Sequence, residues 1–411
     1  MSILASRFRD IVSKSKNFAM KTEAETGVGY SSGYLSFDFL NGTMVHVKSD
    51  DFNFSYYSIG IQDGSMVMFI GRSGCGKTTL AVQMAGNIIR PFSTSCIFHD
   101  DIEGGISDER LQELTKMSGK DFKERYIRRN TGITAENFYE RVKLIHDEKV
   151  NNRDLYEYDT NFLNCDGTRL YKLEPTVYIL DSIALLMPEK YASEDELSGQ
   201  MSSTAAARCN AMVFKRIIPM LKSANIILLT INHINQKVEL TPAQMTKNQL
   251  SYLKKGETLP GGNSIIYLSN LVIRVDDATK IKETDPLGVF GHYVDISLVK
   301  SRSTTAGLSI PMVLTKDGFD QDLSLFLYMK QNNKINGNGA YLYFGNADHL
   351  KFSQKNFKTK LYESEEFRNI FMEEVLKALK ESLDERCVQI IPDTYRSVTD
   401  DLLTMINEKA A

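Results

Sequence analysis

The stretch "SMVMFIGRSGCGKTTLAVQMAGNII" (65–89) joins an apolar run to a segment with helical spacing through a glycine-rich turn. The apolar run predicts a buried strand, and the turn fits the pattern G-x-x-x-x-G-K-[ST]. Glycines let successive backbone N–H groups turn inward around a phosphate chain, and the following helix directs its positive end at the same anion. The stretch therefore predicts a strand–turn–helix unit that binds phosphate.

The side chains of this turn predict which cofactors it holds. Lys77 is expected to reach the β and γ phosphates, and the hydroxyl of Thr78 is expected to ligate Mg²⁺. The predicted cofactors are therefore ATP and Mg²⁺. The residues predicted to contact the nucleotide are Gly71, Arg72, Ser73, Gly74, Cys75, Gly76, Lys77, Thr78 and Thr79.

The composition is typical of a soluble globular protein with a large core. The chain has 411 residues, of which 42% are hydrophobic and 25% charged. A net charge of −3 gives no general attraction to nucleic acid, so DNA binding would need a local basic stripe or repeated subunits. Five scattered cysteines suit a reducing compartment and predict neither disulfides nor zinc. Without an 18-residue apolar run, we expect a cytoplasmic protein with no membrane segment or signal peptide.

The order of apolar runs predicts the fold class. Between residues 61 and 320, short apolar runs alternate with helical segments, which indicates an α/β fold with a mainly parallel, twisted sheet flanked by helices. The strand candidates are "MVMFIG", "SCIFHD", "TVYILDS", "NIILLTINH", "NLVIRVD" and "YVDISLVKS".

The domain organisation follows from changes in pattern along the chain. Residues 1–30 are polar and predict an N-terminal helical arm with a linker, and residues 31–324 are predicted to form the α/β core. Within the core, the aromatic segment 43–58 alternates apolar and polar residues and predicts a hairpin-like insertion. Residues 325–411 predict a small, mainly helical C-terminal domain with Ser364 as an N-cap.

Carboxylates stand at the ends of two predicted strands. Asp181 ends "TVYILD" and is placed to hold Mg²⁺. Asp101 and Glu103 follow the strand "CIFHD", at an edge where a carboxylate could orient and deprotonate water. The residues alone leave open which of the two does so, and a helix cap or solvated turn is the alternative.

A third strand leads into a long polar segment. Asn232 and His233 end "NIILLTINH", where a side chain could sense the γ-phosphate. The polar segment 236–263 follows, and its lysines could contact DNA phosphates, although a solvated charged loop has the same composition. These lysines are Lys237, Lys247, Lys254 and Lys255.

These motifs occur together in a recognisable order. "SSGYLSFDFLNG", "GRSGCGKTTLA", "CIFHDDIE", "YILDSIALLMP", "TINHINQK", "PGGN" and "VKSR" follow one another between residues 31 and 305. In this order the chain resembles the RecA-family DNA recombinases, most closely the phage UvsX-type branch. The resemblance implies a RecA-like P-loop NTPase core.

The resemblance also implies roles for single residues. Glu103 matches the catalytic glutamate, and His233 with Asn232 matches the γ-phosphate sensor. Lys300 and Arg302 match basic residues that reach the ATP of a neighbouring subunit. Arg110 falls where the family stacks a tyrosine on adenine.

Two segments match the DNA-binding loops of this family. These are residues 188–204 and residues 234–260, and the second is longer than in bacterial RecA. The signature that closes the second loop is matched by Gly261, Gly262 and Asn263. The arm, residues 1–30, is expected to pack on the next protomer.

The resemblance implies a DNA-dependent ATPase that forms helical filaments on single-stranded DNA and exchanges it into homologous duplex DNA. Its expected partners are both kinds of DNA, further copies of itself, and single-strand-binding and mediator proteins, in the cytoplasm of a bacterial host if the source is a phage. A DnaB-type hexameric replicative helicase shares the sheet and the phosphate loop, and a non-catalytic ATP-binding recombination mediator is a third reading. Intact Lys77, Thr78 and Asp181 disfavour the mediator.

Overall fold

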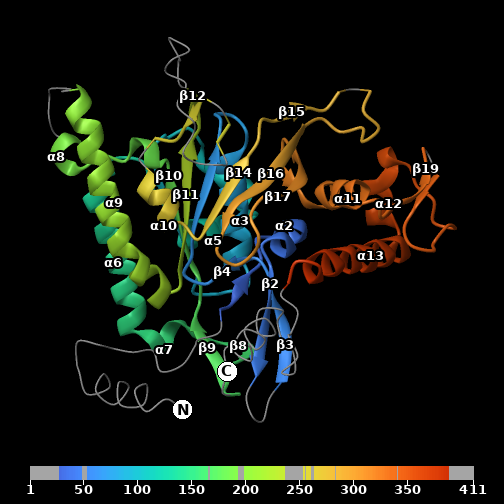
Figure 1. Ribbon diagram of the computed structural model, residues 1–411, viewed down its shortest axis with the longest axis horizontal. Coiled ribbons are helices and arrows are strands. Elements are labelled where there is room, and N and C mark those ends of the chain that lie inside the picture. The colour runs from blue at the N-terminus through green and yellow to red at the C-terminus, as the bar shows by residue number, and fades with distance from the viewer. Residues whose placement is uncertain are drawn as a thin grey trace, which may run out of the picture.

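One large sheet organises the molecule (Figure 1). The computed structural model describes residues 27–48, 53–164, 167–192, 199–236, 253–254, 256–260, 263–282, 284–339 and 341–387. Six strands of the sheet run parallel in the spatial order β7 (Tyr126–Arg129), β6 (Ile97–Asp101), β10 (Thr176–Asp181), β11 (Ile226–His233), β5 (Met66–Gly71) and β14 (Leu271–Val275). Antiparallel strands extend it beyond β14, namely β16 (His292–Ser301), β17 (Leu308–Thr315), β18 (Gly318–Asp320) and the short β15 (Thr279–Lys280).

Helices cover both faces of this sheet (Figure 1). On one face, α6 (Ala135–Asn151), α9 (Gly199–Ser223) and α10 (Asn263–Leu268) pack together, and α3 (Lys77–Ile89) and α4 (Asp108–Thr115) cover the other. Alternate residues of each central strand enter opposite cores: Val67 and Phe69 pack with α3, whereas Met66 and Met68 pack with α6 and α9. Burial on both faces explains why these strands are continuously apolar.

The α/β class and the mainly parallel sheet predicted from the sequence are confirmed, and all six strand candidates form strands of it. Four strands of this sheet were not predicted, namely β7, β15, β17 and β18. β7 reads "YIRR", whose charges hide its strand character, and β17 contains Pro311, which argues against a strand in a sequence pattern. Pro311 is tolerated because β18 pairs only with residues 313–315, so on that side of β17 the proline has no partner among the described strands.

Two hairpins project from the same end of the sheet (Figure 1). Residues 43–58 contain β2 (Thr43–Lys48) and β3 (Asn53–Ser58), which pair antiparallel, so the segment expected as an insertion is a hairpin. A second hairpin, β8 (Glu157–Leu163) with β9 (Arg169–Leu173), has no counterpart in the sequence analysis. The ring of Tyr56 stacks on that of Phe162 at 4.7 Å between centroids, which joins the two hairpins.

The remaining short elements connect this framework. They are β1 (Gly29–Tyr30), α2 (Leu35–Leu40), β4 (Ile61–Gln62), α5 (Gly119–Arg125), α7 (Arg153–Tyr156), η1 (Ile183–Leu185), α8 (Glu189–Ala192), β12 (Asn235–Gln236) and β13 (Glu257–Thr258).

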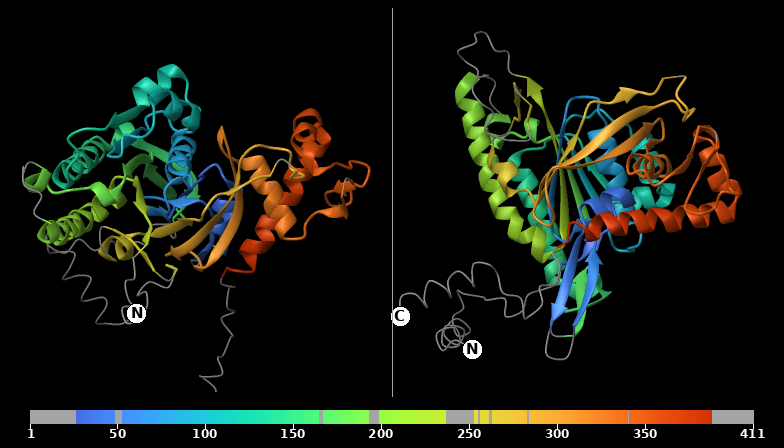
Figure 2. Two further views of the ribbon diagram at one scale, coloured as in Figure 1. Left: turned by 90° about the horizontal axis from the view of Figure 1, so that it is seen from above. Right: turned by 45° about the vertical axis from the view of Figure 1, so that its right-hand side comes forward.

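The C-terminal region lies on the opposite side of the sheet from α9 (Figure 2). It comprises α11 (Gln321–Gln331), β19 (Asn336–Asn338), β20 (Tyr341–Tyr343), η3 (Gln354–Asn356), α12 (Phe357–Glu363) and α13 (Glu365–Asp384). Ser364 caps α13 by accepting a hydrogen bond from the backbone N–H of Phe367. The expected boundary at residue 324 falls inside α11, and the apolar side chains of this region are continuous with the core on the α3 face of the sheet.

Candidate nucleotide-binding site

The glycine-rich turn connects the buried strand β5 to helix α3. Gly76 precedes the helix with a φ of 96°, a left-handed conformation that strains any residue with a Cβ. A Cβ on Gly71 would lie 2.4 Å from the carbonyl oxygen of Val275, so the backbones of β5 and β14 approach too closely for a side chain. Both glycines of the motif therefore satisfy backbone requirements that no other residue meets.

Lys77 is folded into this turn. Its Nζ donates a hydrogen bond to the carbonyl oxygen of Arg72 at 2.6 Å, and the residue is only 4% exposed. Burial lowers the pKa of the ammonium group. The guanidinium of Arg72 instead points outward to Asp277, with 3.1 Å between Nη1 and Oδ2. A phosphate oxygen could replace the Arg72 carbonyl as the acceptor for Lys77, with a stronger charge-assisted hydrogen bond.

Thr78 and Asp181 provide oxygen atoms next to the turn. The Thr78 hydroxyl donates to Asp181 Oδ2 at 2.6 Å across from the end of β10. The other carboxylate oxygen, Oδ1, is buried and has no hydrogen-bond partner, and burial raises the pKa of Asp181 to about 6. The Thr78 hydroxyl and Asp181 Oδ2 together form a pair of oxygen ligands that fits a hard cation such as Mg²⁺.

Glu103 and His233 meet at the same edge of the sheet. Glu103 follows β6 and His233 ends β11, the two strands that flank β10. His233 Nε2 lies 2.5 Å from Glu103 Oε1, and both side chains are partly exposed. Asp101 differs, because it is 1% exposed and forms an ion pair with Arg128 at 2.5 Å. Of the two candidate carboxylates, Glu103 is therefore the one that solvent reaches.

Asn232 connects this edge to the polar segment. Its Nδ2 donates to the carbonyl oxygen of Pro260 at 2.9 Å, and its Oδ1 accepts from the backbone N–H of His233. Pro260 lies at the far end of the predicted second loop. A single side chain thus touches the residue that contacts Glu103 and the last residue of that loop.

Most of the residues predicted to bind DNA lie outside the described part of the chain. This holds for Lys237, Lys247, Lys255, Gly261 and Gly262, and for residues 193–198 of the first predicted loop. Lys254 is described, with its Nζ 3.4 Å from Asp276 Oδ1. Asn263 is the first residue of α10. The assignment of these residues to DNA stays a prediction.

Lys300 and Arg302 lie away from the turn, on and just after β16, which β14 separates from β5. Lys300 Nζ donates to the carbonyl oxygens of Ile266 and Ser269 at the end of α10, and burial lowers its pKa to about 8. Arg302 Nη2 donates to the carbonyl oxygen of Tyr267 at 3.0 Å. Both cations are therefore held by the C-terminal end of a helix, where its dipole favours positive charge.

Arg110, the predicted adenine contact, lies in the first turn of α4. Its Nη1 donates to Glu113 Oε2 at 3.0 Å, one helical turn further along. Within the described part of the chain, the polar contacts of Arg110 are with Ser107 and Glu113 and not with the glycine-rich turn. Its assignment to adenine stays a prediction.

Cys75 lies within the glycine-rich turn. A cysteine inside a phosphate-binding turn suggests sensitivity to thiol alkylation that ATP would protect against. The residue is only 2% exposed, and burial raises the pKa of its thiol. The Sγ lies 3.0 Å from the carbonyl oxygen of Arg72, so the thiol points into the turn and is a poor nucleophile.

Sequence reasoning missed His99 and Arg128 near this edge. His99 is fully buried on β6 with its Nδ1 2.8 Å from the hydroxyl of Tyr126, and Arg128 on β7 neutralises Asp101. A histidine directly before two aspartates, at the end of a short apolar run, was the available signal.

Comparison with known proteins is consistent with a nucleotide-binding chain. No model of a protein family matches it. The chain is similar to the energy-coupling factor transporter ATP-binding protein EcfA2 of Clostridium acetobutylicum, with 32% identity over 123 residues. The matched region is 26% of this chain and spans 41% of the relative's length. Together with the α/β fold and the turn geometry, this similarity supports a P-loop NTPase that binds ATP. Among the described helices, none is long and apolar enough to cross a bilayer.

Proposed function

We propose that this protein is an ATP-dependent DNA recombinase, which assembles as a filament on single-stranded DNA and exchanges that strand into homologous duplex DNA. The observation that carries the proposal is the contact of Glu103 with His233 at 2.5 Å, on the strand that continues directly into the long polar segment. This contact gives the nucleotide site a connection to the segment predicted to bind DNA.

The geometry supports hydrolysis with Glu103 as the base. Glu103 is accessible and held by His233, so it can orient a water molecule and accept its proton, whereas Asp101 is neutralised by Arg128. The positive charge of Lys77 would stabilise the negative charge that develops on the transferred phosphate. Thr78 and Asp181 are the residues that would hold Mg²⁺, which when bound neutralises phosphate charge.

His233 and Asn232 could report the presence of the γ-phosphate. A phosphate oxygen near His233 would compete with Glu103 for Nε2 and release the carboxylate toward water. Because Asn232 bonds both the His233 backbone and Pro260, the same exchange would shift the end of the polar segment. Such a coupling makes DNA affinity depend on ATP.

Lys300 and Arg302 support the assembly part of the proposal. They are held at the end of α10, two strands away from the turn of their own chain. We infer that they reach the ATP of a neighbouring protomer, so that hydrolysis requires the filament. A filament also multiplies weak DNA contacts through avidity, which an acidic chain needs.

A second candidate is an ATPase subunit that energises a transporter, which is favoured by the similarity to a transporter ATP-binding protein. The helicase and mediator readings differ in their assembly and turnover. A helicase would form closed rings and unwind forks without homology. A mediator would not hydrolyse ATP. A transporter subunit would hydrolyse ATP at a rate that DNA does not change.

The test is ATP hydrolysis by the full chain with and without single-stranded DNA, beside electron microscopy with a slowly hydrolysed ATP analogue. We expect DNA to stimulate hydrolysis and open helical filaments to need both ligands. Closed rings would replace the proposal with a helicase, and turnover indifferent to DNA with no filaments would favour the transporter ATPase.

Sharing of the site between subunits is tested by mixing variants. Lys77→Ala and Arg302→Ala should each lose DNA-stimulated hydrolysis, and their mixture should regain part of it, because one chain supplies the turn and the other the cation. A mixture as inactive as its components would contradict a shared site.

A further inference from the structure

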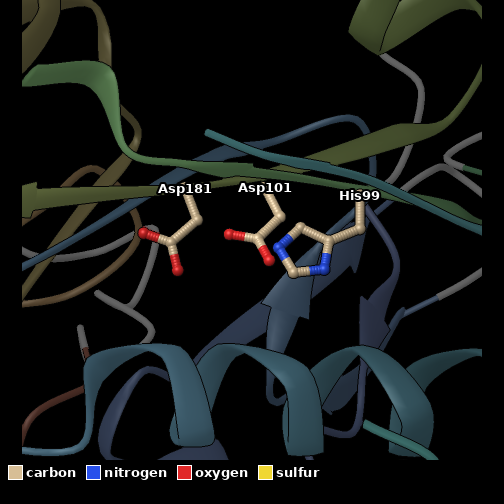
Figure 3. A group of neighbouring side chains, drawn as sticks. All are labelled: His99, Asp101 and Asp181. Atoms are coloured by element: carbon tan, nitrogen blue, oxygen red, sulfur yellow. The ribbon is translucent and has the colours of Figure 1, made fainter. Parts of the chain in front are cut away.

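Three buried side chains meet behind the nucleotide edge: His99, Asp101 and Asp181 (Figure 3). One ligand atom from each lies within 4.8 Å of those of the other two. The sheet produces this grouping, because His99 and Asp101 are two residues apart on β6 and so point to the same face, and Asp101 is in register with Asp181 on β10.

Two atoms of this group have no hydrogen-bond partner. His99 is 0% exposed and Asp181 3% exposed, and His99 Nε2 and Asp181 Oδ1 are both buried and unpaired. In Figure 3 the ring of His99 points toward Asp101, with Asp181 beyond it. An unpaired buried polar atom costs free energy, so two of them in one cluster point to a ligand there.

The donor set identifies the class of ligand. His99 is fully buried, and its unpaired Nε2 can offer a lone pair to a ligand. The Tyr126 hydroxyl, 2.8 Å from Nδ1, can accept the ring N–H and leave Nε2 free for a ligand. Arg128 neutralises only one of the two carboxylates. Imidazole combined with carboxylates suits first-row divalent transition ions, whereas Mg²⁺ prefers oxygen alone.

We propose that His99, Asp101 and Asp181 bind a divalent transition-metal ion of the Mn²⁺ or Co²⁺ kind, at a site separate from the Mg²⁺ of the nucleotide. Asp181 would join the two sites, because its Oδ2 accepts a hydrogen bond from Thr78 and the same carboxylate is a member of the His99 cluster. The inference needs neither DNA nor strand exchange, and its test uses the protein without nucleotide. It can therefore fail or succeed independently of the proposed function.

The experiment is titration of the nucleotide-free full chain with Co²⁺, followed by visible d–d absorption. We expect one ion per chain, and at least about tenfold weaker binding in His99→Leu. Thr78→Val and His233→Leu are matched controls, because the first alters only the nucleotide side of Asp181 and the second removes the other histidine–carboxylate pair. Both should retain the ion.

Loss of the ion in His233→Leu with retention in His99→Leu would overturn the proposal, as would saturation without any d–d band. Thermal unfolding monitored by circular dichroism checks that each variant folds. If His99→Leu does not fold, pulsed electron paramagnetic resonance of Mn²⁺ bound to His233→Leu decides instead. Coupling to an imidazole nitrogen is expected there, and its absence would contradict the site.

Discussion

The nucleotide edge of the sheet and the aromatic cluster of the C-terminal region both contain buried side chains, but they differ in polarity. The edge buries polar groups, and the cluster buries aromatic rings. At the edge, Asp181 Oδ1 and His99 Nε2 lack partners and Lys77 is held inside a turn. The aromatic cluster contains only rings, with centroids 4.8 Å apart for Phe326 and Phe357 and 4.9 Å for Phe344 and Phe352. The remaining members of that cluster are Phe367 and Phe371.

This difference separates binding from stability. Desolvated polar groups cost free energy in the empty protein and are kept where a ligand compensates for them. Packed aromatic rings contribute stability directly, through buried area and edge-to-face contacts. Substitutions at the edge should therefore change turnover more than stability, and substitutions in the cluster should do the reverse.

The largest effect is expected for Glu103→Gln. Loss of the general base should lower ATP turnover on the order of 10²- to 10⁴-fold, while the melting temperature and ATP affinity change little because Glu103 is partly exposed. Phosphate release and binding of a fluorescent nucleotide measure the two effects. If Glu103→Gln hydrolyses ATP as fast as the wild type, another carboxylate is the general base. Asp101→Asn would then test the second candidate.

Phe344→Ala tests the other side of the comparison. This ring is 2% exposed and contacts four other phenylalanines, so we expect a loss of about 3–5 kcal/mol in the free energy of unfolding. Turnover per folded molecule should be unchanged. Urea unfolding measures the loss, and Phe344→Leu is the matched control, with a loss below about 1.5 kcal/mol. If Phe344→Ala lost turnover without losing stability, the proposed separation of binding from stability would be wrong.

Asp181→Asn should show how much the buried carboxylate at the nucleotide edge lowers the free energy of unfolding. The pKa of Asp181 is raised from 3.8 to about 6 in the folded protein, so folding favours the neutral carboxyl. The associated stability is fully present below pH 3.8 and is lost as the pH rises through about 6. The nucleotide-free variant should therefore be more stable than the wild type at pH 7.5, by roughly 2–3 kcal/mol, and ATP turnover should be lost.

Chemical or thermal unfolding across pH 4 to 8 checks this prediction, with EDTA present to remove metal ions. The difference between the two proteins should shrink toward the acidic end. A variant that is less stable at pH 7.5 would show that the carboxylate contributes to the fold rather than opposing it.

The smallest effect concerns Cys75. Because its thiol is buried and its pKa raised, iodoacetamide should modify it more slowly than the partly exposed Cys387. Mass spectrometry of timed samples measures both rates. Equal rates would mean that the glycine-rich turn opens readily without nucleotide, and that the edge is less firmly packed than the aromatic cluster.

Much of the fold was predictable because its signals are local. The strands of the central sheet are apolar runs, and α13 begins at a serine N-cap before a periodic apolar stripe. The hairpin of β8 and β9 was missed, since its register is interrupted between Asp159 and Leu163 and its faces are half exposed. The domain boundary at 324 stays a prediction; that residue lies within α11, and apolar side chains on both sides of it belong to the core on the α3 face of the sheet.

By itself, the sequence determined the strand, the glycine-rich turn and the helix after it, together with the roles expected of Lys77 and Thr78. The glycines, the apolar periodicity and the adjacent Lys77 and Thr78 all lie within one short stretch of sequence, so they can be recognised without knowledge of the fold. Only the tertiary structure decided that Glu103 contacts His233, 130 residues away, and that His99 shares a cluster with Asp181. Those contacts depend on which strands lie side by side and in which register, and sheet register is set by the packing of the whole core.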